Sequence, residues 1–116
     1  MQDLALQAAG VLAIFVAIVH GAIAELQVFP KARVEPQRTR TLLRAVWQLS
    51  TVAWIGIGLL LMAAPSLGSQ TARHWVVAVA VAVYGFAAIG NAVATRGRHV
   101  GWFLMSCVIA LALIGL

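Results

Sequence analysis

The chain has 116 residues, of which 63% are hydrophobic and 9% are charged, and its mean hydropathy is +0.99. A soluble domain of this size would lack the polar side chains to cover its surface, so the composition excludes a soluble fold and predicts a polytopic membrane protein. The net charge of +5 does not indicate nucleic-acid binding, because no aromatic and basic stripe accompanies it. The single cysteine, Cys107, excludes an intramolecular disulfide and a CxxC motif.

Four apolar segments follow one another along the chain, separated by short polar connections. A helix of about 20 apolar residues crosses the roughly 30 Å of bilayer hydrocarbon. We therefore predict an all-α fold, a single transmembrane domain over residues 1–116 that forms an antiparallel bundle of four transmembrane helices. The predicted helices cover residues 4–29, 37–64, 72–95 and 99–116.

The first predicted helix has a ridge of small residues at four-residue spacing, which favours close packing against a neighbouring helix. The ridge consists of Ala9, Ala13, Ala17 and Gly21. His20 falls in or near the hydrocarbon, and Glu25 lies about a turn and a half further, at the headgroup region. Five residues correspond to about 140° around the helix axis, so these two side chains cannot reach one ligand without other helices.

The connection between the first two helices, residues 30–40, is polar and basic. Pro30 lacks an amide proton and ends the first helix, whereas Pro36 fits the first turn of the second. The second helix then carries a polar and aromatic stripe through its first half, with Gln48 at its margin. The stripe consists of Arg40, Arg44, Trp47, Thr51, Trp54 and Gly58.

Residues 64–70 are predicted to form a turn, after which Arg73, His74 and Trp75 mark a membrane interface. The third helix opens with alternating valine and alanine, which would favour a strand in water. In lipid an unpaired strand would leave its backbone polar groups unsatisfied, so a helix is predicted. Tyr84 and Asn91 are seven residues apart and share one face of this helix.

Seven of the eight Lys and Arg side chains fall in or beside the first and third connections. They are Lys31, Arg33, Arg38, Arg40, Arg44, Arg96 and Arg98. Only Arg73 lies at the opposite end of the predicted bundle. By the positive-inside rule these two connections are cytoplasmic, and both termini lie outside.

In this orientation the polar side chains of the helices gather in the cytoplasmic half. The candidate polar cluster consists of His20, Glu25, Arg44, Gln48, Thr51, Asn91 and His99. A structural interpretation makes Glu25 and Arg44 an ion pair between the first two helices. It also gives His20 a hydrogen bond to Gln48 or Thr51, and each such contact is worth about 0.6 to 2 kcal/mol. A functional interpretation stays open, because ionisable residues at membrane depth often line a functional site.

The segments from His20 to Glu25 and from Arg44 to Trp54 (RAVWQLSTVAW) resemble those of a group of small, uncharacterised four-helix bacterial membrane proteins. In that group the first helix ends in His followed by Gly-Glu, and the second carries Trp-His-x-x-Ser/Thr-x-x-Trp. The match covers about the first half of the chain, with Ala24 in place of the group's Gly and Gln48 in place of its His. The resemblance implies a bacterial membrane protein of four helices, but no activity. Together with the positive-inside count, we expect a multi-pass protein of the cell inner membrane with periplasmic termini.

No catalytic constellation is visible, so neither catalytic residues nor an enzyme is predicted. We expect a non-catalytic membrane module, such as an accessory or assembly subunit, in contact with the lipid bilayer and with a membrane-protein partner or further copies of itself. The alternative is a small transporter or ion pathway, which would need polar groups at all depths. A haem or metal bound by His20 and His99 is the weakest alternative, because no His-x-x-x-His or Glu-x-x-His spacing supports it. No cofactor, metal or nucleic-acid partner is therefore predicted.

Overall fold

The computed structural model describes all 116 residues and contains helices but no strands. Helix α1 (Gln2–Ile23) continues through one π-helical turn (Ala24–Val28), and α2 (Gln37–Ala63) continues through a short 3-10 turn (Ala64–Leu67). They are followed by α3 (Gln70–Thr95) and α4 (Gly101–Ile114). The all-α class and the four helices predicted from the sequence are confirmed.

Two tight turns reverse the chain in its second half. Gly68 has a left-handed backbone with φ of 65°, and the Ser69 hydroxyl accepts a hydrogen bond of 3.2 Å from the Ala72 amide. This bond caps the start of α3. Helix α3 ends where Arg96 and Gly97 adopt φ of 52° and 72°, the left-handed conformation common just after a helix.

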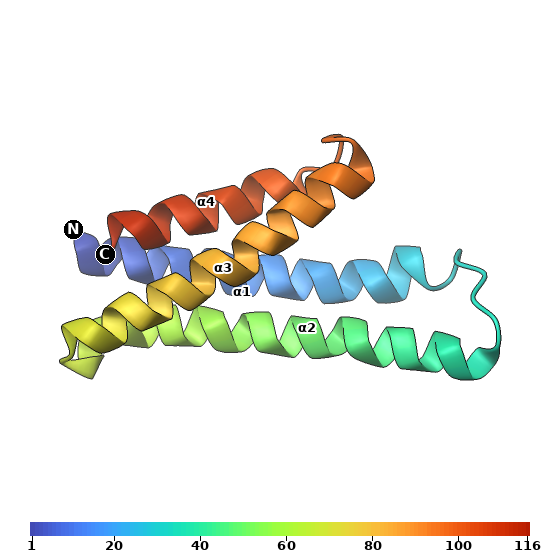
Figure 1. Cartoon of the computed structure of the whole chain (residues 1–116), viewed down its shortest axis with the longest axis horizontal. Helices are drawn as coiled ribbons and strands as arrows, with labels where there is room; N and C mark the ends of the chain where they lie inside the picture. Colours follow the sequence, from blue (N-terminus) through green and yellow to red (C-terminus); the bar gives the residue numbers. More distant parts are fainter.

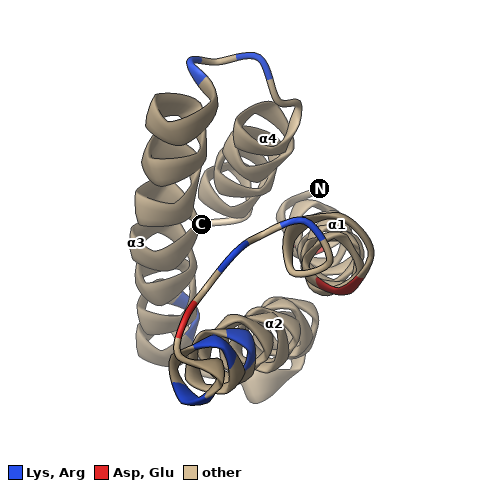
Figure 2. Cartoon of the chain, turned by 90° about the vertical axis from the view of Figure 1, so that its right-hand side faces the viewer, with Lys and Arg blue, Asp and Glu red and all other residues tan.

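Helices α1 and α2 lie side by side as an antiparallel hairpin along the longest axis of the molecule (Figure 1). Helix α4 packs against α1, and α3 runs obliquely from the end of α2 to the start of α4. Figure 2 shows the two hairpins, α1–α2 and α3–α4, from the end at which the chain makes its first and third connections. Toward that end the hairpins diverge, and the α1–α2 hairpin extends past the α3–α4 turn.

The core is built largely from small side chains. Ala9, Ala13 and Ala17 of the predicted ridge are fully buried, and Gly21 is buried as well. The largest fully buried side chains are Tyr84, Leu6, Leu61, Val77 and Val108. No charged residue is buried. Small residues on α1 allow the neighbouring helices to come close, which brings many atoms into van der Waals contact.

Helices α1 and α2 come closest at two glycines. A Cβ atom on Gly10 would lie 2.5 Å from the carbonyl oxygen of Gly58, and one on Gly58 would lie 2.8 Å from the carbonyl oxygen of Gly10. These distances are too short for a carbon and an oxygen that are not bonded, so the backbones touch directly here. Glycine is required at both positions for the observed crossing.

Three of the helical segments, Gln2–Val28, Gln37–Leu67 and Gln70–Thr95, are long and apolar enough to cross a membrane. Helix α4 has 14 residues and a length of about 21 Å, less than the roughly 30 Å of hydrocarbon. The sequence predicted a longer helix over 99–116. The helix is shorter because His99 and Val100 belong to the turn after α3, and the last two residues are not helical.

Candidate functional site

The predicted ion pair between Glu25 and Arg44 joins the π-helical turn to α2. Arg44 Nε donates to Glu25 Oε1 at 3.0 Å, and Arg44 Nη2 donates to Glu25 Oε2. Gln48 Nε2 donates to Glu25 Oε1 at 2.8 Å. The Arg44 side chain is 56% exposed and that of Glu25 is 33% exposed. The pair therefore lies at the surface of the protein, where an ion pair adds little stability when water reaches it.

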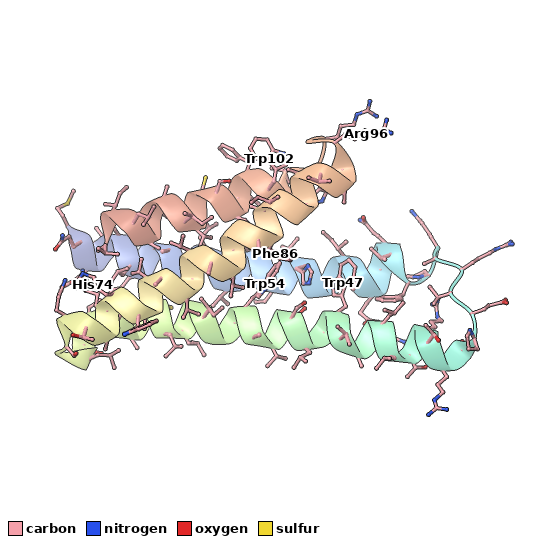
Figure 3. The ribbon with its side chains drawn as sticks, in the orientation of Figure 1. Trp47, Trp54, His74, Phe86, Arg96 and Trp102 are labelled. Atoms are coloured by element: carbon pink, nitrogen blue, oxygen red, sulfur yellow. The ribbon has the colours of Figure 1, made fainter.

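The imidazole of His20 lies between two indoles of α2. Its ring centroid is 4.8 Å from that of Trp47 and 4.4 Å from that of Trp54, and both tryptophans lie between α1 and α2 (Figure 3). His20 Nε2 is 3.0 Å from Ser50 Oγ, so the hydrogen-bond partner is Ser50 and not Gln48 or Thr51 as predicted. Ring stacking and one hydrogen bond thus hold the histidine half-buried between the two helices.

Side chains of α2 also bind the backbone of α1 just before the π-helical turn. Trp47 Nε1 donates to the carbonyl oxygen of His20 at 3.0 Å, and Gln48 Nε2 donates to that of Gly21 at 3.1 Å. Gly21 makes this approach possible, because a Cβ atom there would lie 2.9 Å from Thr51 Cγ2. The polar stripe of α2 therefore binds the main chain of α1 as well as its side chains.

A row of rings runs along the α1–α2 interface and ends on α3. In order it consists of Phe29, Trp47, His20, Trp54 and Tyr84. The Tyr84 hydroxyl lies 3.1 Å from the carbonyl oxygen of Ala13 and 3.4 Å from that of Trp54, and it can donate to either. Tyr84 thereby links α3 to both helices of the other hairpin. The predicted cluster omitted this residue, although it is the only tyrosine in the chain.

Asn91 and His99 do not join the polar groups of α1 and α2. Asn91 Oδ1 accepts a hydrogen bond of 3.1 Å from the Trp102 amide, and His99 Nδ1 accepts one of 3.0 Å from the Gly101 amide. Both side chains cap the start of α4. The structure thus divides the predicted cluster into an α1–α2 part and a separate α3–α4 turn, because the two hairpins diverge at this end.

At the opposite end of the molecule, Arg73 connects three helices. Its Nη1 donates to Asp3 Oδ1 at 2.7 Å, and its Nε donates to the carbonyl oxygen of Gly115 at 2.8 Å. The side chain is only 12% exposed. The sequence identified Arg73 as an interfacial residue but offered no sign of this contact, because its partners lie 70 and 42 positions away along the chain.

No group of three or more His, Cys, Asp or Glu side chains lies close enough together to hold a metal ion. In comparisons with known proteins, no family model, no curated protein and no solved structure matches the chain. The likeness to the group of small four-helix proteins therefore stays a prediction. What the chain does must be inferred from its own geometry.

Proposed function

We propose that the protein is a multi-pass protein of the bacterial inner membrane, an antiparallel bundle of four transmembrane helices with both termini outside. The observation that carries this proposal is the surface of the bundle. Large apolar side chains are exposed on all four helices, including Phe15 on α1, Leu49 on α2, Phe86 on α3 and Phe103 on α4. A bilayer accepts such a surface, whereas water does not.

The two ion pairs support this placement. Asp3 and Glu25 are separated by 22 residues of α1 and its π-helical turn, which corresponds to about 33 Å. This matches the roughly 30 Å of hydrocarbon plus the edge of a headgroup layer. One ion pair would therefore lie in each headgroup region. Lys and Arg gather at the Glu25 end (Figure 2), which favours a cytoplasmic location for that end.

Cysteine labelling tests the orientation. In a Cys107→Ser background, we expect a membrane-impermeant maleimide to label Ser69→Cys in intact cells. We expect Arg33→Cys and Arg98→Cys to react only after the membrane is opened, because their connections would face the cytoplasm. All three positions are exposed, and only Ser69→Cys gives up a hydrogen bond, the one that its hydroxyl accepts from the Ala72 amide, so each variant serves as a control for the others. The reverse labelling pattern would show that the orientation is wrong.

We further propose that the role of the protein is non-catalytic, as an accessory or assembly subunit. Glu25 is engaged by Arg44 and Gln48, and His20 is engaged by Ser50 and two indoles. Their polar atoms thus hold helices together. Beyond Tyr84 the packed core consists of apolar side chains, which include Leu6, Leu61 and Val108. This packing disfavours a polar route through one copy and supports the module over the transporter or ion pathway.

Purification from native membranes tests this role. We expect the tagged full chain, produced at its natural level, to bring down one membrane protein in a constant ratio through successive columns. An unrelated tagged membrane protein of similar size serves as the control. A lone oligomer that conducts ions or solutes in liposomes would contradict the module and favour the transporter. A coloured or metal-containing preparation would favour a cofactor bound by histidine.

A further inference from the structure

Arg40, in the first turn of α2, is held in place by groups that do not neutralise its charge. Its Nη1 donates to the carbonyl oxygen of Ala32 at 2.9 Å, and its Nη2 donates to the carbonyl oxygen of Phe29. The guanidinium carbon also lies 5.7 Å from the centroid of the Phe29 ring. Carbonyls and an aromatic ring carry no net charge. The Arg40 side chain is therefore held in place while no acidic group neutralises its charge. Its remaining N–H groups are free to bind an anion.

An open cavity of about 650 Å³ lies beside Arg40, between the α1–α2 connection and the first turn of α2. It is lined by residues that include Pro30, Arg33, Glu35, Gln37 and Arg40. Arg33 makes no hydrogen bond or ion pair within the protein. Two arginines thus face one cavity in which Glu35 is the only acid.

The depth of this cavity in the membrane, in the proposed orientation, indicates which kind of anion it binds. The connection follows directly after the helix end that carries Glu25, so it lies among the headgroups of the cytoplasmic leaflet. Phosphate groups of anionic phospholipids are concentrated there, and basic residues beside a membrane attract them. Arginine binds phosphate through paired N–H groups. A free phosphate ester has the same chemistry, but it would have to compete with lipid that is already present at this surface.

We infer that the cavity binds the phosphate group of an anionic phospholipid, with Arg33 and Arg40 as its charged contacts. This inference rests on the membrane orientation proposed above. The neighbouring Arg38, which has no ion-pair partner either, adds positive charge at the same end of α2. Glu35 opposes binding, because its carboxylate and the phosphate would repel each other. The site therefore predicts opposite effects for two neutralising substitutions, which a purely structural role would not produce.

Lipid retention by the full chain tests the inference. The purified protein is equilibrated with mixed micelles that contain phosphatidylcholine and phosphatidylglycerol, and native mass spectrometry counts the lipids that remain bound. We expect the unmodified chain to retain phosphatidylglycerol in preference to phosphatidylcholine. Arg33→Gln should lower this preference by about fivefold, and Glu35→Gln should raise it by a similar factor. Both side chains are exposed, so neither change should disturb folding.

Arg98→Gln is the matched control, because it removes one positive charge from the same end of the molecule but lies in the α3–α4 turn, outside the cavity. It should leave the preference unchanged. Equal losses in Arg33→Gln and Arg98→Gln would show a response to net charge alone and overturn the site. Displacement of the lipid by soluble glycerol phosphate at similar concentration would overturn the lipid assignment in favour of a free phosphate ester.

A further experiment distinguishes failure of the phosphate site from failure of the membrane proposal. The chain is first mixed with vesicles of phosphatidylcholine alone and floated on a density gradient. A chain that does not float with these neutral vesicles contradicts membrane insertion itself. A chain that floats but shows no preference for phosphatidylglycerol contradicts only the phosphate site.

Discussion

Alanine in place of Gly58 is expected to destabilise the protein by about 1 to 3 kcal/mol, the usual cost of forcing extra atoms into a packed interface. The added Cβ would lie 2.8 Å from the carbonyl oxygen of Gly10 and 2.7 Å from Ile14 Cγ1. A side chain could turn aside, but a backbone carbonyl moves only if the helix moves with it. The loss should appear as a lower midpoint when helix content is followed by circular dichroism during unfolding in detergent.

Gly56 provides the control for this experiment. It lies in the same helix two residues earlier, and a Cβ there would have no atom within 4 Å. Because alanine favours a helix over glycine by about 0.8 to 1 kcal/mol, Gly56→Ala should be neutral or slightly stabilising. Gly10→Ala should behave like Gly58→Ala. If Gly56→Ala and Gly58→Ala proved equally harmless, the two helix backbones would not be in contact.

Truncation of Tyr84 to alanine is expected to cost about 3 to 5 kcal/mol, as for other large buried side chains. Tyr84 is fully buried, and its ring lies 5.3 Å from that of Trp54. Its hydroxyl is the polar contact of α3 with the backbones of α1 and α2. Tyr84→Phe keeps the ring and removes only the hydroxyl, so it should cost about 0.5 to 1.5 kcal/mol. Unfolding in detergent measures both losses.

Phe86→Ala is the control for Tyr84→Ala, because it removes an aromatic ring that is not buried. Phe86 lies two residues further along α3 (Figure 3), and 83% of its surface is exposed. Its removal takes away a ring of similar size but no internal contact of the core, so the midpoint of unfolding should hardly change. A loss as large as that of Tyr84→Ala would mean that the outer face of α3 is covered, for example by a second copy of the chain.

The helices could be predicted because their cause lies in local sequence. The alternating valines and alanines at the start of α3 show this well. Their pattern favours a strand, yet the high overall hydropathy points to lipid, where only a helix satisfies its own backbone. The structure has a helix there. The length of α4 was harder to predict, because the apolar residue Val100 continues the hydrophobic run although it belongs to the preceding turn.

The contact between Glu25 and Arg44 could also be anticipated. Two helices joined by a short connection must be antiparallel neighbours, so counting residues from the connection places both side chains at similar depth. The partners of His20 could not be found in this way. Gln48, Ser50 and Thr51 lie within one turn of α2, and the choice among them depends on the rotation of each helix about its axis. The π-helical turn Ala24–Val28 follows His20, so it shifts the later residues, including Glu25, around the helix axis relative to His20.

The remaining errors concern contacts between the two hairpins. Asn91 and His99 lie at the same end of the molecule as His20, and depth alone suggested one cluster. Depth does not report how far α3 leans from α2, which depends on packing around Tyr84 and on the turn at Gly68. The Arg73 contacts were also missed, because they join residues near the two ends of the chain and depend on how the two hairpins pack together.

The short α4 has a consequence for the lipid around the protein. In the proposed orientation, α1 with its π-helical turn has 27 residues and a length of about 40 Å, whereas α4 is about 21 Å long. Each ångström of mismatch between helix and bilayer costs a fraction of a kcal/mol. The bilayer would therefore be thinned at the α4 edge and not at the α1–α2 edge. Lipids with longer acyl chains should therefore increase the mismatch at the α4 edge before they do so at the α1–α2 edge. A change in membrane thickness would act on one side of the protein more than on the other.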